Sequence, residues 1–498
     1  MSSIRTIFLD ARSDWRSERQ ALKANDAWYT YEELAVHVES IASTLSKSGI
    51  KAGDIVGQVA ENSFEMIVNI FAVFRIGAVY CPLSRYFSMS ELTYRIEHSG
   101  LNAVIADEEN YQRVSEIANT SSNHDFMVLP VNLKDDFIQN VPLPDVKSEQ
   151  PILLLYTSGS TGLPKGCLLS EKNLLVNATQ VINRTQLTRE DRILHQMPLH
   201  HTNGINNNLI APFLAGAQVV LGPRFYAPEL FSILQKERPT YFTGVPTMYY
   251  RLIKEPIPEG ALDSLRFVRC GSAPLSVKLE REIEDYLKVP VITSYGLTEG
   301  TCTSTMTPID EKKYGSVGKP MSGQEVRIIS PATGEFLPVG EEGEVVVRGE
   351  NLMLGYYKNP EATEKTLRDG WLYTGDLGRV DEEGYLFLSD RIKDLIVRGG
   401  ENVSPKEIEE SLSLHEDIDE VAVVGIKDEE YGEIPVAFIV SNKSFSHEEL
   451  KAYSMSKLSR FKVPERFIQV NALPRNALGK VERSKLVSKA QNEKVINK

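Results

Sequence analysis

The most unusual stretch of this sequence reads Leu155-Tyr156-Thr157-Ser158-Gly159-Ser160-Thr161-Gly162-Leu163-Pro164-Lys165-Gly166. From Thr157 onward it holds four hydroxyl residues, three glycines and one lysine in ten positions. Glycine lets the backbone approach a ligand closely, and hydroxyl, backbone N–H and lysine groups all donate hydrogen bonds to anions. The stretch therefore predicts a loop that binds a polyphosphate, although its spacing is not that of the GxxxxGK[ST] phosphate loop. A flexible Ser/Gly linker is the alternative, and the apolar run before the loop, a predicted buried strand from Pro151 to Leu155, disfavours it.

Predicted helices and strands alternate on both sides of this loop. Before it, a helix begins at Thr30, where Glu33 completes a capping box, and residues 54–60 are typical of a buried strand. After it, a helix over 173–181 and a strand over 217–221 repeat the pattern. This alternation indicates an α/β class with mainly parallel strands, arranged as two stacked layers.

The last third of the chain has a different pattern. From Gly315, short strands separated by Gly, Pro and Asp predict a small antiparallel barrel or sheet. The pattern changes again at Asp390-Arg391-Ile392-Lys393, and a compact α+β domain of about a hundred residues is expected beyond it. The last dozen residues are predicted to be disordered.

Composition indicates the broad class of protein. The chain has 498 residues, of which 42% are hydrophobic and 25% charged, as in soluble globular proteins of roughly three domain-sized units. Its net charge of −13 argues against nucleic acid or an anionic membrane as the main partner. Four scattered cysteines without a CxxC pair indicate a reducing compartment and no metal cluster, and no apolar run has membrane-spanning length. We therefore expect a cytoplasmic protein without stable membrane insertion.

Four further blocks follow the loop along the chain. They are Ser294-Tyr295-Gly296-Leu297-Thr298-Glu299, Tyr373-Thr374-Gly375-Asp376, Ser389-Asp390-Arg391-Ile392-Lys393-Asp394 with Gly399-Gly400-Glu401-Asn402, and Pro474-Arg475-Asn476-Ala477-Leu478-Gly479-Lys480. Together with the loop, they resemble the motifs of the adenylate-forming (AMP-binding) superfamily of acyl-CoA synthetases, peptide-synthetase adenylation domains and firefly-type luciferases. Each block alone is weakly specific, but all of them in family order across the whole chain are a strong signal.

The resemblance implies a fold and a reaction. The fold would be a large N-terminal domain (1–390) of two stacked α/β subdomains plus a small β-barrel, with a small mobile α+β C-terminal domain (391–498). The reaction would be ATP-dependent activation of a carboxylic acid to acyl-AMP with release of pyrophosphate, then transfer to the thiol of coenzyme A. ATP, Mg²⁺ and coenzyme A would be required, the partner would be a small-molecule acid and not nucleic acid, and a homodimer is compatible with the sequence.

Charge repulsion explains why such a site needs these residue types. The acid must approach ATP as an anion, and two unit charges 4 Å apart repel by about 4 kcal/mol at an effective dielectric constant near 20. Cations, N–H donors and Mg²⁺ near the reacting groups offset this repulsion.

The resemblance assigns most of the blocks to the nucleotide. The loop from Thr157 to Lys165 would hold the β- and γ-phosphates, Thr298 would donate to the α-phosphate, and Glu299 with Thr161 would hold Mg²⁺. Tyr295 would stack on adenine, and Asp376 with Arg391 would bind the ribose. The remaining residues expected around the nucleotide are Gly271, Ser272, Ala273 and Gly296. Taken singly, each of these has an ordinary structural interpretation, such as a turn aspartate or a core tyrosine.

The acyl pocket is expected near His201, which would shape the pocket and respond to carboxylate binding. A packed structural histidine is the alternative, and His200 departs from the aromatic residue that the family usually has at its position. Because unpartnered buried amides cost roughly 1–3 kcal/mol each, the asparagines at 203 and 206–208 favour a small or polar acid; alternatively they cap the following helix. The substrate-binding set also includes Asn203, Asn207, Gly271 and Thr301.

The C-terminal blocks would serve the two half-reactions. By resemblance, Lys480 would bridge the substrate carboxylate and the α-phosphate during adenylation. Gly399 and Gly400 would line the channel for the pantetheine arm of coenzyme A, and Lys393 would be the hinge between the two arrangements.

Other functions remain open at this stage. A stand-alone adenylation enzyme that loads a carrier protein's pantetheine arm would use the same residues. A luciferase-like oxygenase is disfavoured because luciferases resemble one another in having Lys where this chain has Val397. An inactive nucleotide sensor is disfavoured because Lys480, Glu299 and Asp376 are all present.

Overall fold

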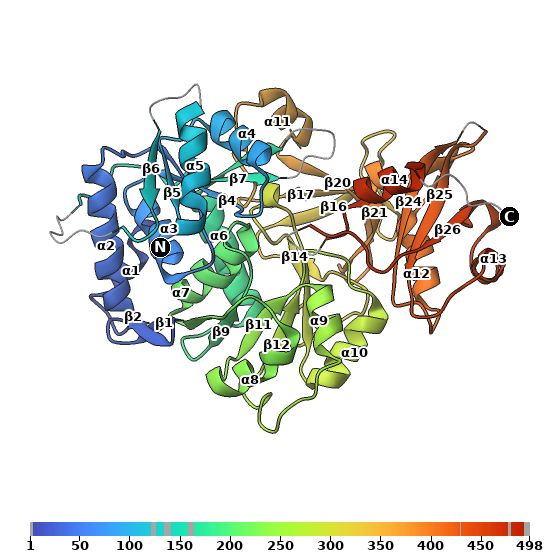
Figure 1. Ribbon diagram of the computed structural model, residues 1–498, viewed down its shortest axis with the longest axis horizontal. Helices are drawn as coiled ribbons and strands as arrows, with labels where there is room; N and C mark the ends of the chain where they lie inside the picture. The colour runs from blue at the N-terminus through green and yellow to red at the C-terminus, as the bar shows by residue number, and fades with distance from the viewer. Residues whose placement is uncertain are drawn as a thin grey trace.

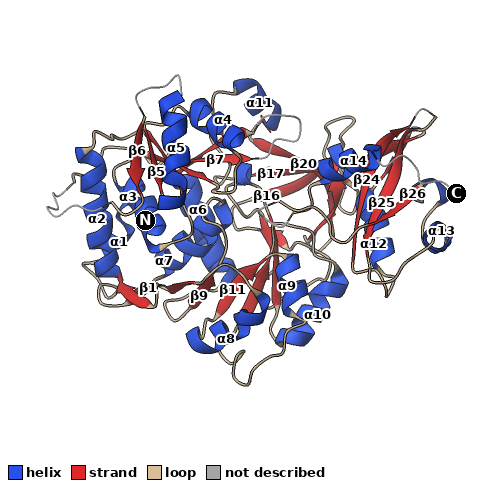
Figure 2. Cartoon of the chain, in the orientation of Figure 1, coloured by secondary structure: helices blue, strands red, loops and turns tan. Residues whose placement is uncertain are grey.

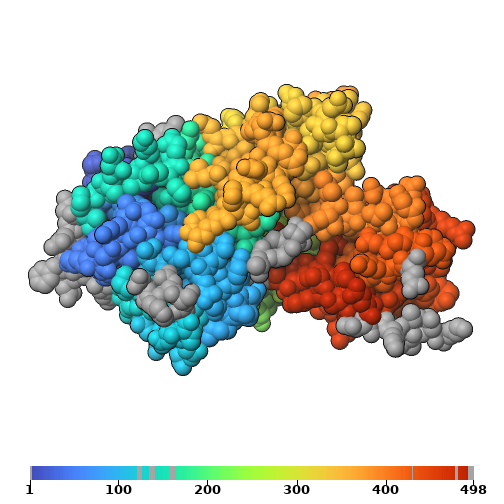
Figure 3. All heavy atoms as spheres, turned by 90° about the horizontal axis from the view of Figure 1, so that it is seen from above, coloured from blue at the N-terminus to red at the C-terminus, as the bar shows by residue number. Residues whose placement is uncertain are grey.

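The computed structural model describes residues 3–120, 126–133, 141–157, 164–428, 430–476 and 480–492. Figure 1 shows a large body and, at one end of it, a smaller C-terminal part in the deeper orange and red. The space-filling view from above shows the same division (Figure 3).

The first sheet of the large body has seven strands in the order β18-β8-β7-β4-β3-β5-β6. Strands β7, β4, β3, β5 and β6 run parallel, and β8 and β18 join one edge in antiparallel pairing. Their bounds are β3 (Ile55–Val59), β4 (Val79–Leu83), β5 (Ala103–Ala106), β6 (Met127–Pro130), β7 (Pro151–Thr157), β8 (Lys165–Ser170) and β18 (Gly355–Tyr356). The β3 and β4 strands are buried along their whole length, as parallel strands covered on both faces are.

The second sheet has nine strands in the order β15-β14-β13-β12-β11-β9-β10-β1-β2. The strands from β13 to β1 are parallel neighbours, so the carboxyl ends of β11, β12 and β13 lie at one edge of the sheet. Their bounds are β1 (Gln20–Ala24), β2 (Ala27–Thr30), β9 (Arg192–His195), β10 (Gln218–Leu221), β11 (Tyr241–Gly244), β12 (Phe267–Cys270), β13 (Val291–Tyr295), β14 (Thr305–Met306) and β15 (Lys319–Pro320).

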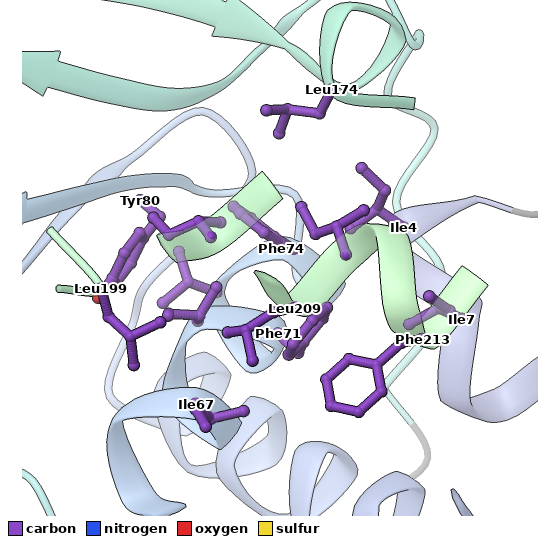
Figure 4. Close-up of a cluster of buried hydrophobic side chains, with 14 of the residues drawn as sticks. Ile4, Ile7, Ile67, Phe71, Phe74, Tyr80, Leu174, Leu199, Leu209 and Phe213 are labelled. Atoms are coloured by element: carbon purple, nitrogen blue, oxygen red, sulfur yellow. The ribbon is translucent and has the colours of Figure 1, made fainter. Parts of the chain in front are cut away.

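A layer of helices between the two sheets builds a shared hydrophobic core. Figure 4 shows Phe71, Phe74, Tyr80 and Phe213 from this core. Phe71 and Phe74 lie on one helix, Phe213 on another and Tyr80 on strand β4, so the core joins segments from both sides of the phosphate loop in the sequence. The helices of this layer are α1 (Ile7–Ala11), α2 (Tyr31–Lys47), α3 (Phe64–Arg75), α6 (Glu171–Thr185), the π-helix Asn203–Ile210 and α7 (Ala211–Ala215). The two stacked α/β layers expected from the sequence are therefore confirmed.

Further helices cover the outer faces of the sheets (Figure 2). α4 (Met89–Ser99) and α5 (Glu108–Thr120) pack on the seven-stranded sheet, and α8 (Ala227–Glu237), α9 (Pro246–Leu252) and α10 (Val277–Leu287) pack on the nine-stranded sheet. Local signals set where helices begin: at α2, Thr30 accepts from the Glu33 N–H and Glu33 accepts from the Thr30 N–H, which is the predicted capping box.

A five-stranded antiparallel sheet connects the body to the C-terminal part. Where the sequence predicted a small barrel or sheet, β16 (Glu325–Ile329), β17 (Gly343–Arg348) and β20 (Trp371–Val380) lie side by side, and β19 (Leu367–Arg368) and β21 (Leu386–Arg391) both pair with β20. Helix α11 (Pro360–Thr366) precedes β19. Strand β21 ends at Arg391, and the single-turn 3₁₀ helix Ile392–Asp394 follows it.

The C-terminal part is an α+β unit with its own sheet. Its strands are β22 (Ile396–Arg398), β23 (Glu401–Val403), β24 (Glu420–Asp428), β25 (Gly432–Val440) and β26 (Arg466–Gln469), and its helices are α12 (Pro405–Ser413), α13 (His447–Met455) and α14 (Arg483–Asn492). The prediction that the last dozen residues are disordered is wrong for residues 487–492. Leu486 and Ala490 of α14 are buried against residues of β24 and β25, and this tertiary packing stabilises a helix that local composition did not favour. Within the described ranges, no helix is long and apolar enough to cross a membrane.

Candidate active site

The expected site residues gather at the carboxyl ends of β12 and β13, where ligands bind in open α/β sheets. Gly271, Ser272 and Ala273 follow β12, and Gly296 follows β13. A Cβ atom at Gly296 would lie 1.7 Å from the carbonyl oxygen of Cys302, so only glycine fits between this turn and the next segment. The tight crossing brings the residues after both strands to one place.

The ends of the phosphate loop are held by strand pairing. Thr157 at the end of β7 is opposite Lys165 at the start of β8, so the hairpin closes at this pair. Ser158, Gly159, Ser160, Thr161 and Gly162 lie outside the described residues, and their predicted phosphate and Mg²⁺ contacts stay predictions.

Asp376 links two other expected nucleotide residues. Its Oδ2 accepts a hydrogen bond of 2.6 Å from the Tyr295 hydroxyl, and its Oδ1 accepts one of 2.7 Å from Arg391 Nε. Asp376 and Arg391 are opposite each other on β20 and β21, and Tyr295 ends β13. Burial and then the Asp376 charge raise the pKa of Tyr295, so its hydroxyl stays protonated and donates. Each carboxylate oxygen keeps a lone pair, so the group can also accept the two ribose hydroxyls.

Glu299 has a partner that the sequence did not indicate. Its Oε1 accepts a hydrogen bond of 2.8 Å from the Tyr356 hydroxyl, and Lys165 Nζ lies 4.8 Å from the centre of the same tyrosine ring. Tyr356 belongs to the edge strand β18, which pairs with β8. The signal in the sequence was the run Gly355-Tyr356-Tyr357, but the two adjacent tyrosines could not be told apart without the pairing. Tyr356 thus connects the expected Mg²⁺ ligand with the lysine of the phosphate loop.

We expect Tyr356→Phe to raise the KM for Mg-ATP roughly tenfold, since hydrogen bonds to charged groups contribute about 1.5–3 kcal/mol. Phenylalanine keeps the ring beneath Lys165 and removes only the hydroxyl that orients Glu299. The measurement is initial rate against Mg-ATP at saturating acid and coenzyme A. Tyr357→Phe is the matched control, because the Tyr357 hydroxyl donates to the Ser99 carbonyl, away from Glu299. Equal KM values in both variants would remove Tyr356 from the nucleotide site.

Lys480 lies beside these groups although it belongs to the C-terminal part. Surrounding protein lowers the pKa of Lys480, and the Arg391 charge lowers it further, while Asp376 and Glu299 act in the opposite direction. Its side chain nevertheless keeps exposed surface. A second contact between the two parts joins the Tyr250 hydroxyl on α9 to Asp419 Oδ1 at 3.0 Å.

His201 is the residue expected at the substrate carboxylate, and Lys480 is among the charges that act on it. Burial, then His200 and then Lys480 lower the pKa of His201, so the imidazole is neutral at pH 7. Burial alone lowers the pKa of His200 to about 4, and the two rings are 4.4 Å apart. Lys480 is one of the charges that lower the pKa of His201, which indicates that the two side chains lie near each other. The role of His201 at the carboxylate stays a prediction.

The asparagine-rich stretch forms the π-helix Asn203–Ile210, and the helix-capping alternative is wrong because α7 continues this helix without a side-chain cap. Asn206, Asn207 and Asn208 are all buried. Asn207 Nδ2 lies 3.3 Å from Asn203 Oδ1, 3.1 Å from Cys302 Sγ and 3.0 Å from Thr303 Oγ1, while its Oδ1 has no hydrogen-bond partner among the described residues. π-Helical turns are rare and are frequently found at functional sites.

Thr298 and Thr301 hold the segment that faces this π-helix. Thr298 begins the 3₁₀ turn Thr298–Gly300, and its carbonyl accepts from Cys167 Sγ at 3.6 Å. Thr301 has φ +70° and ψ −49°, and the Cys302 N–H donates to the Gly300 carbonyl, which together make a strained γ-turn. The Thr301 hydroxyl donates to the Asn351 carbonyl, so it is already engaged within the protein, and the predicted contact of Thr301 with substrate stays a prediction.

The residues predicted to be the hinge and to line the channel follow Arg391 in the chain. Lys393 is the middle residue of the 3₁₀ turn, and burial followed by the Arg391 charge lowers its pKa. Gly399 and Gly400 form the exposed turn between β22 and β23, with φ of +60° and +88°. The Gly399 N–H donates to the Tyr431 carbonyl within the C-terminal part.

Comparisons with known proteins identify the family. Residues 9–357 match the model of the AMP-binding enzymes, and residues 407–480 match that of the AMP-binding enzyme C-terminal domain. Sulfoacetate–CoA ligase of Cupriavidus necator is 33% identical over 93% of this chain and 92% of that protein. Feruloyl-CoA synthase of an Amycolatopsis species is 34% identical over 91% of this chain and 92% of that one.

Solved structures agree over nearly the whole chain. ATP-bound MatB from Rhodopseudomonas palustris has a TM-score of 0.92 at 29% identity and apo MatB one of 0.81 at 30%, each covering 98% of this chain and 99% of that one. The o-succinylbenzoate CoA synthetase MenE of Bacillus subtilis in complex with ATP and magnesium ion has a TM-score of 0.87 at 31% identity, covering 96% and 98%.

The chain therefore belongs to the AMP-binding enzyme family. It is an acid–CoA ligase, which uses ATP to convert a carboxylic acid to acyl-AMP and then passes the acyl group to coenzyme A.

Proposed function

We propose that Lys480, Glu299, Asp376 and His201 form the adenylating centre and that the structure holds the arrangement in which acyl-AMP is made. The observation that carries this proposal is the position of Lys480, a residue of the C-terminal part, next to Asp376 and Glu299 of the N-terminal part. The TM-score is 0.92 with ATP-bound MatB and 0.81 with apo MatB. Because the two MatB structures share one fold, this difference reflects how their parts are arranged, and it supports the proposal that the chain has the ATP-bound arrangement.

Each group has a task in the first half-reaction. Lys480 offsets the charge between the incoming carboxylate and the α-phosphate, which is an electrostatic contribution of the kind that dominates such steps. Asp376, fixed by Tyr295 and Arg391, orients the ribose and thereby the α-phosphate. Neutral His201 adds no charge of its own next to Lys480 and borders the carboxylate.

Glu299 suits Mg²⁺, since this hard cation takes one or two protein carboxylates together with phosphate oxygens. One oxygen of Glu299 accepts from Tyr356, and this hydrogen bond orients the carboxylate. When bound, Mg²⁺ neutralises phosphate charge.

The second half-reaction needs a different arrangement of the same parts. The turn at Gly399 and Gly400 hydrogen-bonds to Tyr431 of its own domain here, while Lys480 fills the adenylating centre. We assign the domains to 1–390 and 391–498 and place the hinge at Lys393, in the short turn that joins β21 to the C-terminal sheet. Rotation there would withdraw Lys480 and present the glycine turn to the pantetheine arm.

The acid remains to be assigned. The relatives named above act on acids as different as sulfoacetate and ferulate at similar identity, so relationship alone does not select one. We place the enzyme in the cytoplasm, as a monomer or homodimer acting on small molecules.

Acid-dependent pyrophosphate–ATP exchange without coenzyme A tests the adenylating centre. We expect exchange with at least one acid of a broad panel, and thioester only after coenzyme A is added. No exchange with any acid, from a folded preparation that binds Mg-ATP, would refute the proposal.

A further inference from the structure

Arg269 is a buried cation that has no carboxylate partner in the part of the chain that the structure describes. It lies on β12, and its side chain is 2% exposed. Its Nε and Nη1 are buried and donate no hydrogen bond to any described residue. Burial lowers the pKa of Arg269, and the groups that act against this effect are Tyr241, Cys302 and Tyr249, none of which is a carboxylate. Burying an unpaired guanidinium, which stays protonated, is strongly unfavourable, and such charges in proteins are normally paired.

Strand alternation directs Arg269 to the inner face of the sheet. Its neighbours Val268 and Cys270 belong to the outer cluster under α8, α9 and α10, whereas Phe267 belongs to the core between the sheets. Gly271 is two residues farther along and therefore on the face of Arg269, about 7 Å away at the rise of a β-strand. A Cβ at Gly271 would lie 3.0 Å from Ser294 Oγ. Gly271 is therefore next to the first residue of the family block Ser294–Glu299.

A second unpartnered polar atom, the Tyr241 hydroxyl, lies on the strand next to that of Arg269. The Tyr241 hydroxyl is buried without a hydrogen-bond partner among the described residues. Tyr241 and Arg269 each shift the pKa of the other, which indicates that they lie near each other. The Arg269 charge acts to lower the pKa of Cys302 against the effect of burial. Cys302 Sγ lies 3.1 Å from Asn207 Nδ2. Arg269 thus borders the π-helix and the strained segment at Thr301, on the acyl side of the site.

Arg269 and Lys480 serve separate positions. Lys480 belongs to the C-terminal part and keeps exposed surface, and Arg391, Asp376, Glu299 and Lys393 act on its pKa. Arg269, in contrast, is buried on β12. The carboxylate that reacts with ATP must be at Lys480, so it does not pair with Arg269. The guanidinium and the Tyr241 hydroxyl are both donors, and their complement is a second anionic group.

We propose that the acid substrate carries a second anionic group, a carboxylate or a sulfonate, that accepts hydrogen bonds from Arg269 and Tyr241. This proposal rests on the proposed function, since it concerns the acid that the adenylating centre activates. One anion of the substrate reacts with ATP, and the other pairs with Arg269 on the inner face of β12. An acid without the second anion leaves the guanidinium unpaired, and the enzyme discriminates against it for that reason.

The test compares acids of matched length in the pyrophosphate–ATP exchange assay. Succinate is compared with butyrate, glutarate with valerate, and sulfoacetate with propionate, and a phenolic aromatic acid is included. We expect wild-type kcat/KM to be about 100-fold higher for the preferred dianionic acid than for its matched partner. Arg269→Met should remove most of this ratio and leave the KM for ATP unchanged, whereas Arg269→Lys should restore part of it. Whether dicarboxylates or sulfonates are preferred identifies the second anion.

A binding measurement accompanies the assay. The preferred dianionic acid, together with AMP, should raise the Tm of the wild type and not that of Arg269→Met, whose own Tm should be equal or higher because a buried unpaired charge is gone. Arg266→Met is the matched control, since Arg266 already pairs with Asp191 and is partly exposed. Exchange with monoanionic acids only, or an unchanged ratio in Arg269→Met, would overturn the proposal while the adenylating function stands. Exchange with no acid would overturn both.

Discussion

Lys480→Ala should lower acid-dependent pyrophosphate–ATP exchange by roughly 10²–10³, the range for losing one electrostatic contact to a developing charge. The variant removes the cation placed beside Asp376 and Glu299 at the point where carboxylate and α-phosphate meet. Thioester formation from preformed acyl-AMP and coenzyme A should stay near the wild-type rate, because that step no longer opposes two anions.

The pH profile gives a second readout for the same residue. Only the ammonium form can offset the anions, and surrounding protein and Arg391 lower the pKa of Lys480. Exchange should therefore fall as pH rises through this lowered pKa, and the alkaline limb should disappear in Lys480→Ala.

Lys485→Ala is the control for these experiments. Lys485 lies on α14 and pairs with Glu482 at the surface, so its loss should leave both half-reactions intact. Wild-type exchange in Lys480→Ala would exclude Lys480 from adenylation, and equal losses in both half-reactions would indicate damage to the C-terminal domain.

Lys393→Pro should separate the two half-reactions. Proline fixes φ near −65°, which is within about 15° of 3₁₀ values, and removes an N–H that has no intrahelical partner in the first turn. The substitution therefore suits the turn Ile392–Asp394 as it stands and resists rotation away from it. Acyl-AMP formation should persist within about tenfold, roughly 1.4 kcal/mol of barrier. Thioester formation from added acyl-AMP and coenzyme A should fall by orders of magnitude.

Lys393→Ala is the matched control, because it removes the side chain and keeps the backbone free to turn. Both half-reactions are measured on one preparation, with folding checked by circular dichroism. If the hinge is a backbone device, the alanine variant should retain thioester formation. Unimpaired thioester formation in Lys393→Pro, or equal losses in both steps, would exclude the hinge assignment.

Local features of the chain were readable from the sequence. The capping box at Thr30 and Glu33 and the buried strands depend on residues a few positions apart, so periodicity and caps were sufficient to predict them. The order of the family blocks likewise predicted the α/β class, the C-terminal domain and the reaction, because these motifs are recognisable without knowing their neighbours in space.

Contacts between distant positions were decided only by the tertiary structure. Tyr356 rather than Tyr357 reaches Glu299 because β18 pairs with β8 in one register, and a shift of one residue would turn the other tyrosine to that face. Helix α14 is stabilised because Leu486 and Ala490 pack against hydrophobic side chains of β24 and β25. In the sequence, Arg269 is one arginine in an apolar strand. That no carboxylate among the described residues pairs with it follows from which side chains the two sheets enclose, and this depends on packing between segments far apart in the chain.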